Sequence, residues 1–321
     1  MHPITDPQLS EGLAGFKSLL PEGVGLEDIP ATRDYLGKLL KEMAAQAPPM
    51  PGIKTSDHFT PGAEGDPDVM VRIYQPENAA ETLPGMLWIH GGGYVLGDVE
   101  GDDLKAKSMV LGINCVVAAV EYRLAPEHPY PAPLEDCYAA LKWFSEHAAE
   151  FGVDPQRIAI GGASAGGGLA AGLGLLARDR GEVDVAYQLL IYPMIDDSNI
   201  DQAEDGIADT EVWTRRNNLI GWRSYLGQEP GGEGISQYAA PIRATDLSGL
   251  PPTYIGVGTP DLFLKENFTY AQRLIEAGVP TEFHVYRDGF HGFDGFAAMS
   301  DAAQRFTSEQ MKLVARALHG D

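Results

Sequence analysis

An apolar segment, a pentapeptide of small residues and a small-residue helical run follow one another within residues 157–180. The apolar segment is RIAIG at 157–161, the pentapeptide is GASAG at 162–166, and LAAGLGLLA begins at residue 169. A Gly-x-Ser-x-Gly pentapeptide between a strand and a helix is the context of a nucleophile elbow, a sharp turn that exposes the serine hydroxyl. Small residues on both sides of Ser164 leave room for that turn. The feature predicts an α/β fold with a reactive serine between a strand and a helix.

Strand-like and helix-like segments alternate along most of the chain. Apolar segments that predict strands lie at 69–73, 86–90, 115–122, 157–161, 187–193, 252–258 and 281–286. Helical segments are predicted at about 27–47, 131–149, 165–180, 262–277 and 302–318. Such alternation is typical of a largely parallel sheet covered by helices on both faces. The 321 residues fit one domain of this kind with an elaboration.

Two stretches stand outside this alternation. The N-terminal stretch contains an apolar helical stripe made of Leu36, Leu39, Leu40 and Met43. Residues 196–250 are too long for a connecting loop and carry many acidic residues, and insertions after a strand often form lids over α/β active sites. We therefore expect an N-terminal helical part at 1–50, a catalytic core made of 51–195 and 251–321, and an insertion at 196–250.

Charge and cysteine usage restrict the partners and the compartment. Asp and Glu number 46 against 23 Lys and Arg, and the net charge of -23 repels phosphate backbones and anionic lipids, so we expect no nucleic-acid partner. The first residues lack a basic and apolar signal, and no stretch approaches 18 apolar residues, so we expect neither a secretory signal nor a membrane span. Cys115 and Cys137 are predicted to be buried free thiols, which fits a cytoplasmic protein.

A glycine triplet follows the predicted strand at 86–90. The run is His90-Gly91-Gly92-Gly93, where bare backbone can present N–H groups to a developing oxyanion. A serine hydroxyl also needs a base and an acid that orients the base.

The base and the acid follow the serine along the chain in this type of fold. Of the eight histidines, only His291 lies in the loop that directly follows the last predicted strand, where glycines flank it, whereas His284 lies within a strand pattern. Asp261 directly follows the preceding predicted strand, and we expect it to orient the histidine. Glu266, five residues later, is the alternative acid, and Asp288 is too close to His291 in sequence for the usual geometry.

Four motifs together resemble the hormone-sensitive-lipase family of α/β-hydrolases. They are HGGG at 90–93, EYRLAPEHPYPA at 121–132, GASAGG at 162–167 and HGF at 291–293. The resemblance implies an α/β-hydrolase fold with an eight-stranded, mostly parallel sheet flanked by helices. It also implies a helical cap, in the places that residues 1–50 and 196–250 occupy, and hydrolysis of carboxylic esters, through an acyl-enzyme.

The resemblance also implies roles for single residues. The nucleophile, the base and the acid are implied at Ser164, His291 and Asp261. The oxyanion hole is implied at the N–H groups of Gly92, Gly93 and Ala165, in preference to that of Gly91. The chain departs from the family at Ala163, where an aspartate is usual, and at residues 260–263, which read Pro-Asp-Leu-Phe where Asp-Pro-Leu is more common. The first departure removes a carboxylate close to the predicted elbow.

Aromatic residues near these motifs suggest a substrate pocket. Candidates for an apolar acyl or alcohol pocket are Tyr94, Trp213, Trp222 and Tyr225. The alternative is that these side chains hold the cap to the core. We expect short-chain esters as substrates, because the sequence shows a capped enzyme without an evident lipid-binding surface.

Other functions remain as alternatives. An amidase, a formamidase or a lactonase could use the same three residues, and a non-catalytic small-molecule receptor is known on this fold in the plant gibberellin receptors. Those receptors lack the histidine, whereas this chain has His291.

The run GGGLAA at 166–171 fits a dinucleotide-binding pattern but lacks an acidic partner about 20 residues later, and zinc-site spacing is missing, so we expect no cofactor and no metal. The resemblance also suggests a homodimer.

Overall fold

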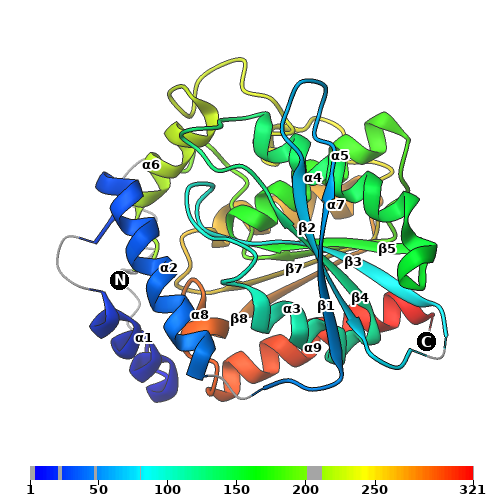
Figure 1. The fold of residues 1–321 in the computed structure, drawn as a ribbon. Helices are drawn as coiled ribbons and strands as arrows, with labels where there is room; N and C mark the ends of the chain where they lie inside the picture. Colours follow the sequence, from blue (N-terminus) through cyan, green and yellow to red (C-terminus); the bar gives the residue numbers. More distant parts are fainter. Residues whose placement is uncertain (1–3, 21–23, 47–48, 80, 201–211, 321) are drawn as a thin grey trace.

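A single sheet of eight strands runs through the protein (Figure 1). The computed structural model describes residues 4–20, 24–46, 49–79, 81–200 and 212–320. The strands are β1 (Ile53–Thr60), β2 (Val69–Pro76), β3 (Leu83–Ile89), β4 (Val116–Glu121), β5 (Val153–Ala163), β6 (Tyr187–Ile191), β7 (Thr253–Gly258) and β8 (Thr281–Tyr286). Their order is β1-β2-β4-β3-β5-β6-β7-β8, and only β2 runs antiparallel to its neighbours. The predicted eight-stranded, mostly parallel sheet is confirmed.

Helices cover both faces of the sheet. They are α1 (Pro7–Leu19), α2 (Ile29–Gln46), α3 (Asp103–Met109), α4 (Ala132–Glu146), α5 (Ala165–Arg180), α6 (Arg215–Leu226), α7 (Leu264–Glu276), α8 (Phe293–Phe296) and α9 (Asp301–His319). Helices α4, α5 and α7 lie on one face, and α3 and α9 lie on the other (Figure 1). In the part of the chain that the structure describes, no helix has the length and apolarity that crossing a membrane requires.

Each face of the sheet has its own hydrophobic core, and the alternation of side chains along each strand supplies both. In β3, Leu87 points into the core beneath α4 and α5, whereas Met86 and Trp88 point into the core beneath α3 and α9. All seven residues of β3 are buried, which explains why its sequence is almost continuously apolar.

Strand β1 and the short helix α3 are elements that the sequence pattern misses. Strand β1 forms the edge of the sheet, its sequence IKTSDHFT is polar, and Phe59 is 65% exposed. The stripe predicted at about 27–47 lies on α2 but is only partly covered, because Leu36 and Leu39 are half-buried and Leu40 is exposed. The side chain of Met43 lies outside the described residues.

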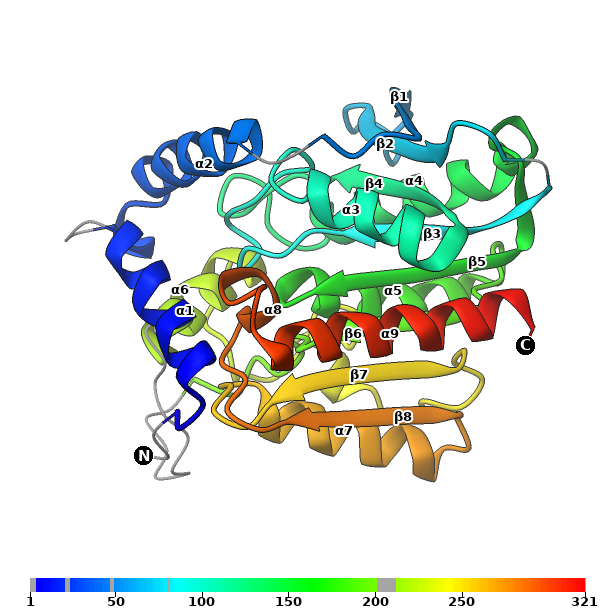
Figure 2. The ribbon, with the colours of Figure 1, turned by 90° about the horizontal axis from the view of Figure 1, so that it is seen from below.

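The parallel strands point with their carboxyl ends toward the side where α1, α2, α6 and α8 gather (Figure 2). Helix α1 contacts α8 there. The N-terminal helices and α6 of the insertion at 196–250 therefore both lie near the loops that follow the strands. Residues 201–211 of that insertion lie outside the described residues, and the division into core and cap stays a prediction.

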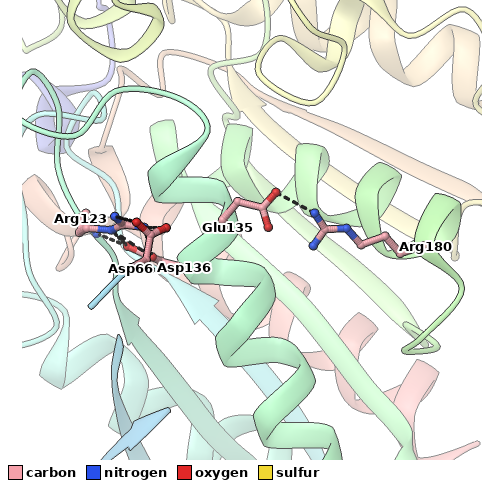
Figure 3. A network of polar contacts seen from close by, with 5 residues as sticks. All are labelled: Asp66, Arg123, Glu135, Asp136 and Arg180. Carbon is pink, nitrogen blue, oxygen red and sulfur yellow. Dashed lines mark hydrogen bonds and ion pairs between the residues drawn. The ribbon is translucent and has the colours of Figure 1, made fainter. Parts of the chain in front are cut away.

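An ion-pair network fixes the loop after β4 against α4 (Figure 3). The guanidinium of Arg123 donates to both carboxylate oxygens of Asp136, at 2.7 and 2.9 Å, and to Asp66 at 2.9 Å. The Asp136 side chain is only 1% exposed, and these hydrogen bonds raise the pKa of Arg123 above its usual range. Glu135 and Arg180 form a neighbouring pair between α4 and α5. The network holds a loop that borders the glycine triplet, since Ala125 N donates to Tyr94 O at 3.0 Å.

Candidate active site

Ser164 occupies a strained turn between β5 and α5. Its φ of 59° and ψ of -121° are rare for a residue with a side chain, and its N–H donates to Ile191 O at 2.9 Å. A Cβ atom on Gly162 would lie 2.3 Å from Gly166 O, and one on Gly166 would lie 2.2 Å from Ile89 O. Close backbone contacts, within the turn for Gly162 and with the end of β3 for Gly166, therefore require both glycines.

The structure brings the three residues that were predicted to act together into one hydrogen-bonded chain. His291 Nε2 lies 2.9 Å from Ser164 Oγ, and His291 Nδ1 lies 2.9 Å from Asp261 Oδ2. The three side chains come from loops after β5, β7 and β8, so the parallel sheet delivers them to one edge. Ser164 is 8% exposed, His291 is 6% exposed and Asp261 is fully buried. The second carboxylate oxygen of Asp261 accepts the N–H of Phe263 at 2.9 Å, which fixes the carboxylate plane.

The alternative acids face elsewhere. Glu266 accepts N–H groups of Ile195 and Asp196 and the side-chain amide of Asn199, at 2.8, 3.2 and 2.7 Å. Burial, together with the charge of Asp196, raises the pKa of Glu266 well above its usual range. Glu266 therefore fastens the start of the 196–250 insertion to α7.

Two further side chains were set apart from the site on sequence grounds. Asp288 accepts hydrogen bonds from Thr5 and Asp6 at the start of α1. His284 lies in β8, near Glu282 and Glu309.

The glycine triplet forms a tight turn beside Ser164. Gly92 O accepts the N–H groups of Val95 and Leu96, at 3.1 and 2.8 Å. The φ angles of Gly92 and Gly93 are 123° and 61°, and a Cβ on Gly92 would lie 2.1 Å from Leu96 O. Only glycine fits such a backbone.

The loop is also held from behind. The His90 ring stacks on Tyr122 with 4.2 Å between ring centroids, and Tyr122 Oη donates to His90 O at 3.0 Å. A Cβ on Gly91 would lie 2.8 Å from Ala163 O, so the triplet sits directly against the elbow. Ala165 directly follows Ser164, and the triplet meets the elbow through Gly91. The role of Gly92, Gly93 and Ala165 as oxyanion donors stays a prediction.

The four predicted pocket aromatics are packed rather than open. Tyr94, Trp222 and Tyr225 are fully buried, and the rings of Tyr94 and Tyr225 stack with 3.9 Å between centroids. Trp213 is 7% exposed and lies against the glycine triplet, because a Cβ on Gly93 would be 2.0 Å from Trp213 Cη2. This packing favours the alternative, that these side chains join the insertion to the core. A pocket lined by them stays a prediction.

Sequence reasoning missed several residues that support the site. The rings of Tyr192 and Phe263 lie edge to face against His291, at centroid distances of 4.7 and 5.1 Å. Arg33 on α2 donates to Val95 O and Ala125 O, both at 2.6 Å, next to the glycine triplet. No local motif marks Arg33, which precedes Val95 by 62 residues.

This arrangement is suited to acyl transfer. A serine hydroxyl bonded to a histidine, whose other nitrogen is held by a carboxylate, can be deprotonated as it attacks a carbonyl carbon. Backbone N–H groups beside it can stabilise the negative oxygen that forms. Within the described ranges, no group of three or more His, Cys, Asp or Glu side chains is arranged to hold a metal ion.

Comparisons with known proteins agree with this chemistry. A family model described as alpha/beta hydrolase fold matches residues 86–295. The carboxylesterase NlhH of Mycobacterium tuberculosis is 39% identical over 271 residues, which cover 81% of this chain and 82% of that protein. The esterase LipI of the same organism is 35% identical over 99% of this chain and 97% of its own length. The solved structure of a bacterial heroin esterase is 41% identical, with a TM-score of 0.92 over 98% of both chains.

Proposed function

Because the chain belongs to the α/β-hydrolase family of hormone-sensitive-lipase-like carboxylesterases and is a carboxylic ester hydrolase, we propose that Ser164 is its nucleophile, with His291 as base and Asp261 as the orienting acid. The observation that carries the proposal is the unbroken hydrogen-bonded chain of these three side chains, with both distances at 2.9 Å.

The reaction follows from these two hydrogen bonds. Ser164 Oγ attacks the ester carbonyl carbon while its proton passes to His291 Nε2, and Asp261 holds the imidazolium that forms. The carbonyl oxygen becomes an oxyanion that the N–H groups of Gly92, Gly93 and Ala165 stabilise. The intermediate collapses with breakage of the C–O bond, and the leaving alkoxide takes the proton from His291. Water then attacks the acyl carbon while His291 takes its proton. The proton passes to Ser164 Oγ as the carboxylic acid leaves.

The test uses wild type, Ser164→Ala and His291→Ala. We expect an organophosphonate to form a single adduct on wild type, seen by intact mass, and none on Ser164→Ala. Removal of the nucleophile or the base is expected to lower kcat by about 10⁶-fold, as in other serine hydrolases with this triad. Wild-type turnover by a folded Ser164→Ala variant would overturn the proposal.

The substrate class is proposed to be short-chain esters. The aromatic side chains near the glycine triplet are buried against one another, so little room for a long acyl chain is expected there. Acetyl, butyryl, octanoyl and palmitoyl p-nitrophenyl esters test this, and we expect kcat/KM to fall with chain length. A maximum at palmitoyl would contradict it. An anilide with the same acyl group, cleaved as fast as its ester, would favour the amidase alternative.

We further propose that residues 1–50 and 196–250 form a cap over the site. Contact of α1 with α8, next to His291, and of Trp213 with Gly93 supports this division. Hydrogen exchange with and without the phosphonate tests it. Slower exchange in these two stretches on adduct formation is expected, and unchanged exchange in both would contradict the proposal.

The protein is also proposed to form a homodimer through the edge of the sheet at β8. Val285 on this strand is 46% exposed, and Phe268 and Ile275 on the adjoining helix α7 are each 57% exposed. Light scattering on a sizing column is expected to give the mass of two chains for wild type and of one chain for Val285→Lys. The mass of one chain for wild type would refute the dimer.

A cytoplasmic location is proposed from the two cysteines. Cys115 and Cys137 are free and buried, and burial raises the pKa of both thiols. Disulfides predominate in secreted proteins and free thiols in reducing compartments. Cell fractionation with an antibody tests the location, and recovery outside the cytoplasmic fraction would contradict it.

A further inference from the structure

The His291 ring is enclosed by two aromatic walls. Tyr192 and Phe263 meet it at interplanar angles of 63° and 85°. The two hydrogen bonds of His291 both lie at ring nitrogens, and the bond to Ser164 breaks as the proton moves. During that interval the hydrogen bond to Asp261 and the packing of the aromatic walls hold the ring in place. Because proton transfer requires close hydrogen-bond geometry, the position of these walls bears directly on the rate.

Tyr192 is itself held in an unusual conformation. It follows β6 with a φ of 33°. A positive φ is uncommon for a residue with a side chain, and residues in such conformations are found preferentially at functional sites. Its N–H donates to Gly256 O at 2.7 Å, and its ring lies nearly parallel to that of Phe306. Its Oη donates to Asp294 Oδ1 at 2.6 Å. Backbone, ring and hydroxyl are thus all fixed.

The acceptor of that hydrogen bond is an anchored carboxylate. The Asp294 side chain is 5% exposed and lies on α8, three residues after His291. Its other oxygen pairs with Lys105 Nζ of α3 at 2.9 Å. Burial opposes ionisation of Asp294, but the Lys105 charge and the hydrogen bonds from Tyr192 and Lys105 outweigh it and lower its pKa. A hydroxyl that donates to a carboxylate forms a strong, short bond.

We propose that Tyr192 is a positioning residue, which its bond to Asp294 locks against His291 so that Nε2 stays in line with Ser164 Oγ. The hydrogen-bonded series Lys105–Asp294–Tyr192 connects α3, α8 and the end of β6. It has no direct role in the movement of protons. The proposal rests on the proposed function of His291 as the base.

The test compares Tyr192→Phe, which keeps the ring and removes only Oη, with Tyr286→Phe. Tyr286 is the matched control because it also packs on Phe306 and donates to a carboxylate, that of Glu309, whereas its ring contacts and hydrogen bonds are made with residues other than His291. We expect Tyr192→Phe to lower kcat about tenfold and Tyr192→Leu about a hundredfold, with KM unchanged, because small misplacements of a catalytic group have effects of this size. The rate of phosphonate adduct formation should fall by the same factors.

Rescue by a conservative variant separates positioning from mere stability. Asp294→Asn keeps an oxygen that can accept from Tyr192, so its kcat is expected to lie between those of wild type and Asp294→Ala. An equal kcat for Tyr192→Phe and Tyr286→Phe, or a raised KM with unchanged kcat, would overturn the positioning role. Ser164→Ala is run beside these variants: if it is inactive while Tyr192→Phe equals wild type, only the positioning proposal fails. Tyr192→Phe decides the matter even if Tyr192→Leu does not fold.

Discussion

Two glycines in α1 allow a sharp test of how the N-terminal helix is attached to the site. A Cβ on Gly12 would lie 2.4 Å from Ala297 Cβ and 2.9 Å from its Cα, whereas a Cβ on Gly15 would meet nothing within 4 Å. Ala297 directly follows α8 and therefore the loop of His291. The same substitution, Gly→Ala, is thus predicted to act in opposite directions three residues apart in one helix.

The magnitudes follow from two terms. Replacing glycine by alanine inside a helix stabilises it by about 1 kcal/mol, and this gain is common to both variants. Overpacking at Gly12 costs about 1–3 kcal/mol, because the neighbouring atoms belong partly to backbone that has to shift. We therefore expect Gly15→Ala to stabilise the attachment of α1 by up to about 1 kcal/mol and Gly12→Ala to weaken it by up to about 2 kcal/mol.

Hydrogen exchange of the α1 amides is the direct assay. The difference of about 1–3 kcal/mol between the variants corresponds to about 5–150-fold in exchange rate. Steady-state hydrolysis of a p-nitrophenyl ester is measured in parallel, and kcat is expected to fall only in Gly12→Ala, because α1 supports α8. Equal protection of α1 in the two variants would refute the reasoning, since it would mean that α1 does not rest on Ala297.

Two further predictions concern the glycine triplet at 91–93 and the carboxylate of Asp294. Gly93→Ala places a Cβ 2.0 Å from Trp213 Cη2 at a φ of 61°, so the backbone has to shift and the N–H of residue 93 is displaced. We expect kcat/KM to fall by about 100-fold, the size of effect that loss of one oxyanion donor has. Near-normal kinetics would contradict the proposed role of this loop. Asp294 has a lowered pKa in the folded protein, so its stabilising contribution is fully present above the unfolded value of about 3.9 and is lost as the pH falls through the folded value. Urea unfolding of wild type and Asp294→Asn is expected to differ most near pH 7 and to converge toward pH 3, and a difference that grows on acidification would show the sign to be wrong.

Local sequence patterns are sufficient to predict most strands of the sheet and the three residues that meet in the site. Strands β2 to β8 lie within a few residues of the predicted segments, because β2 to β7 are largely buried and rich in apolar residues and the edge strand β8 alternates apolar and polar residues. Ser164, Asp261 and His291 lie in the loops that follow β5, β7 and β8, so their convergence follows from the parallel order of the strands.

Features without a local pattern are beyond such prediction. Strand β1 is polar and lies at an edge, so its pairing with β2 rather than its own composition makes it a strand. The contacts of Arg33 with Val95 O and of Lys105 with Asp294 join segments separated by 62 and 189 residues. Their partners depend on how the whole chain packs, which single-residue patterns do not encode.

The attachment of α1 also has a consequence for how the protein is made. Thr5 binds Asp288 across 283 residues of chain, so the first helix leaves the ribosome long before the loop that holds it exists. At synthesis rates of about 5–20 residues per second, the delay is about 15–60 s. Throughout that time Leu9, which is fully buried in the finished protein, has no docking surface and is available to chaperones. The loop that carries His291, the proposed base, is made after all of the strands, so the nascent chain is expected to be inactive toward esters until that loop has been made and has folded.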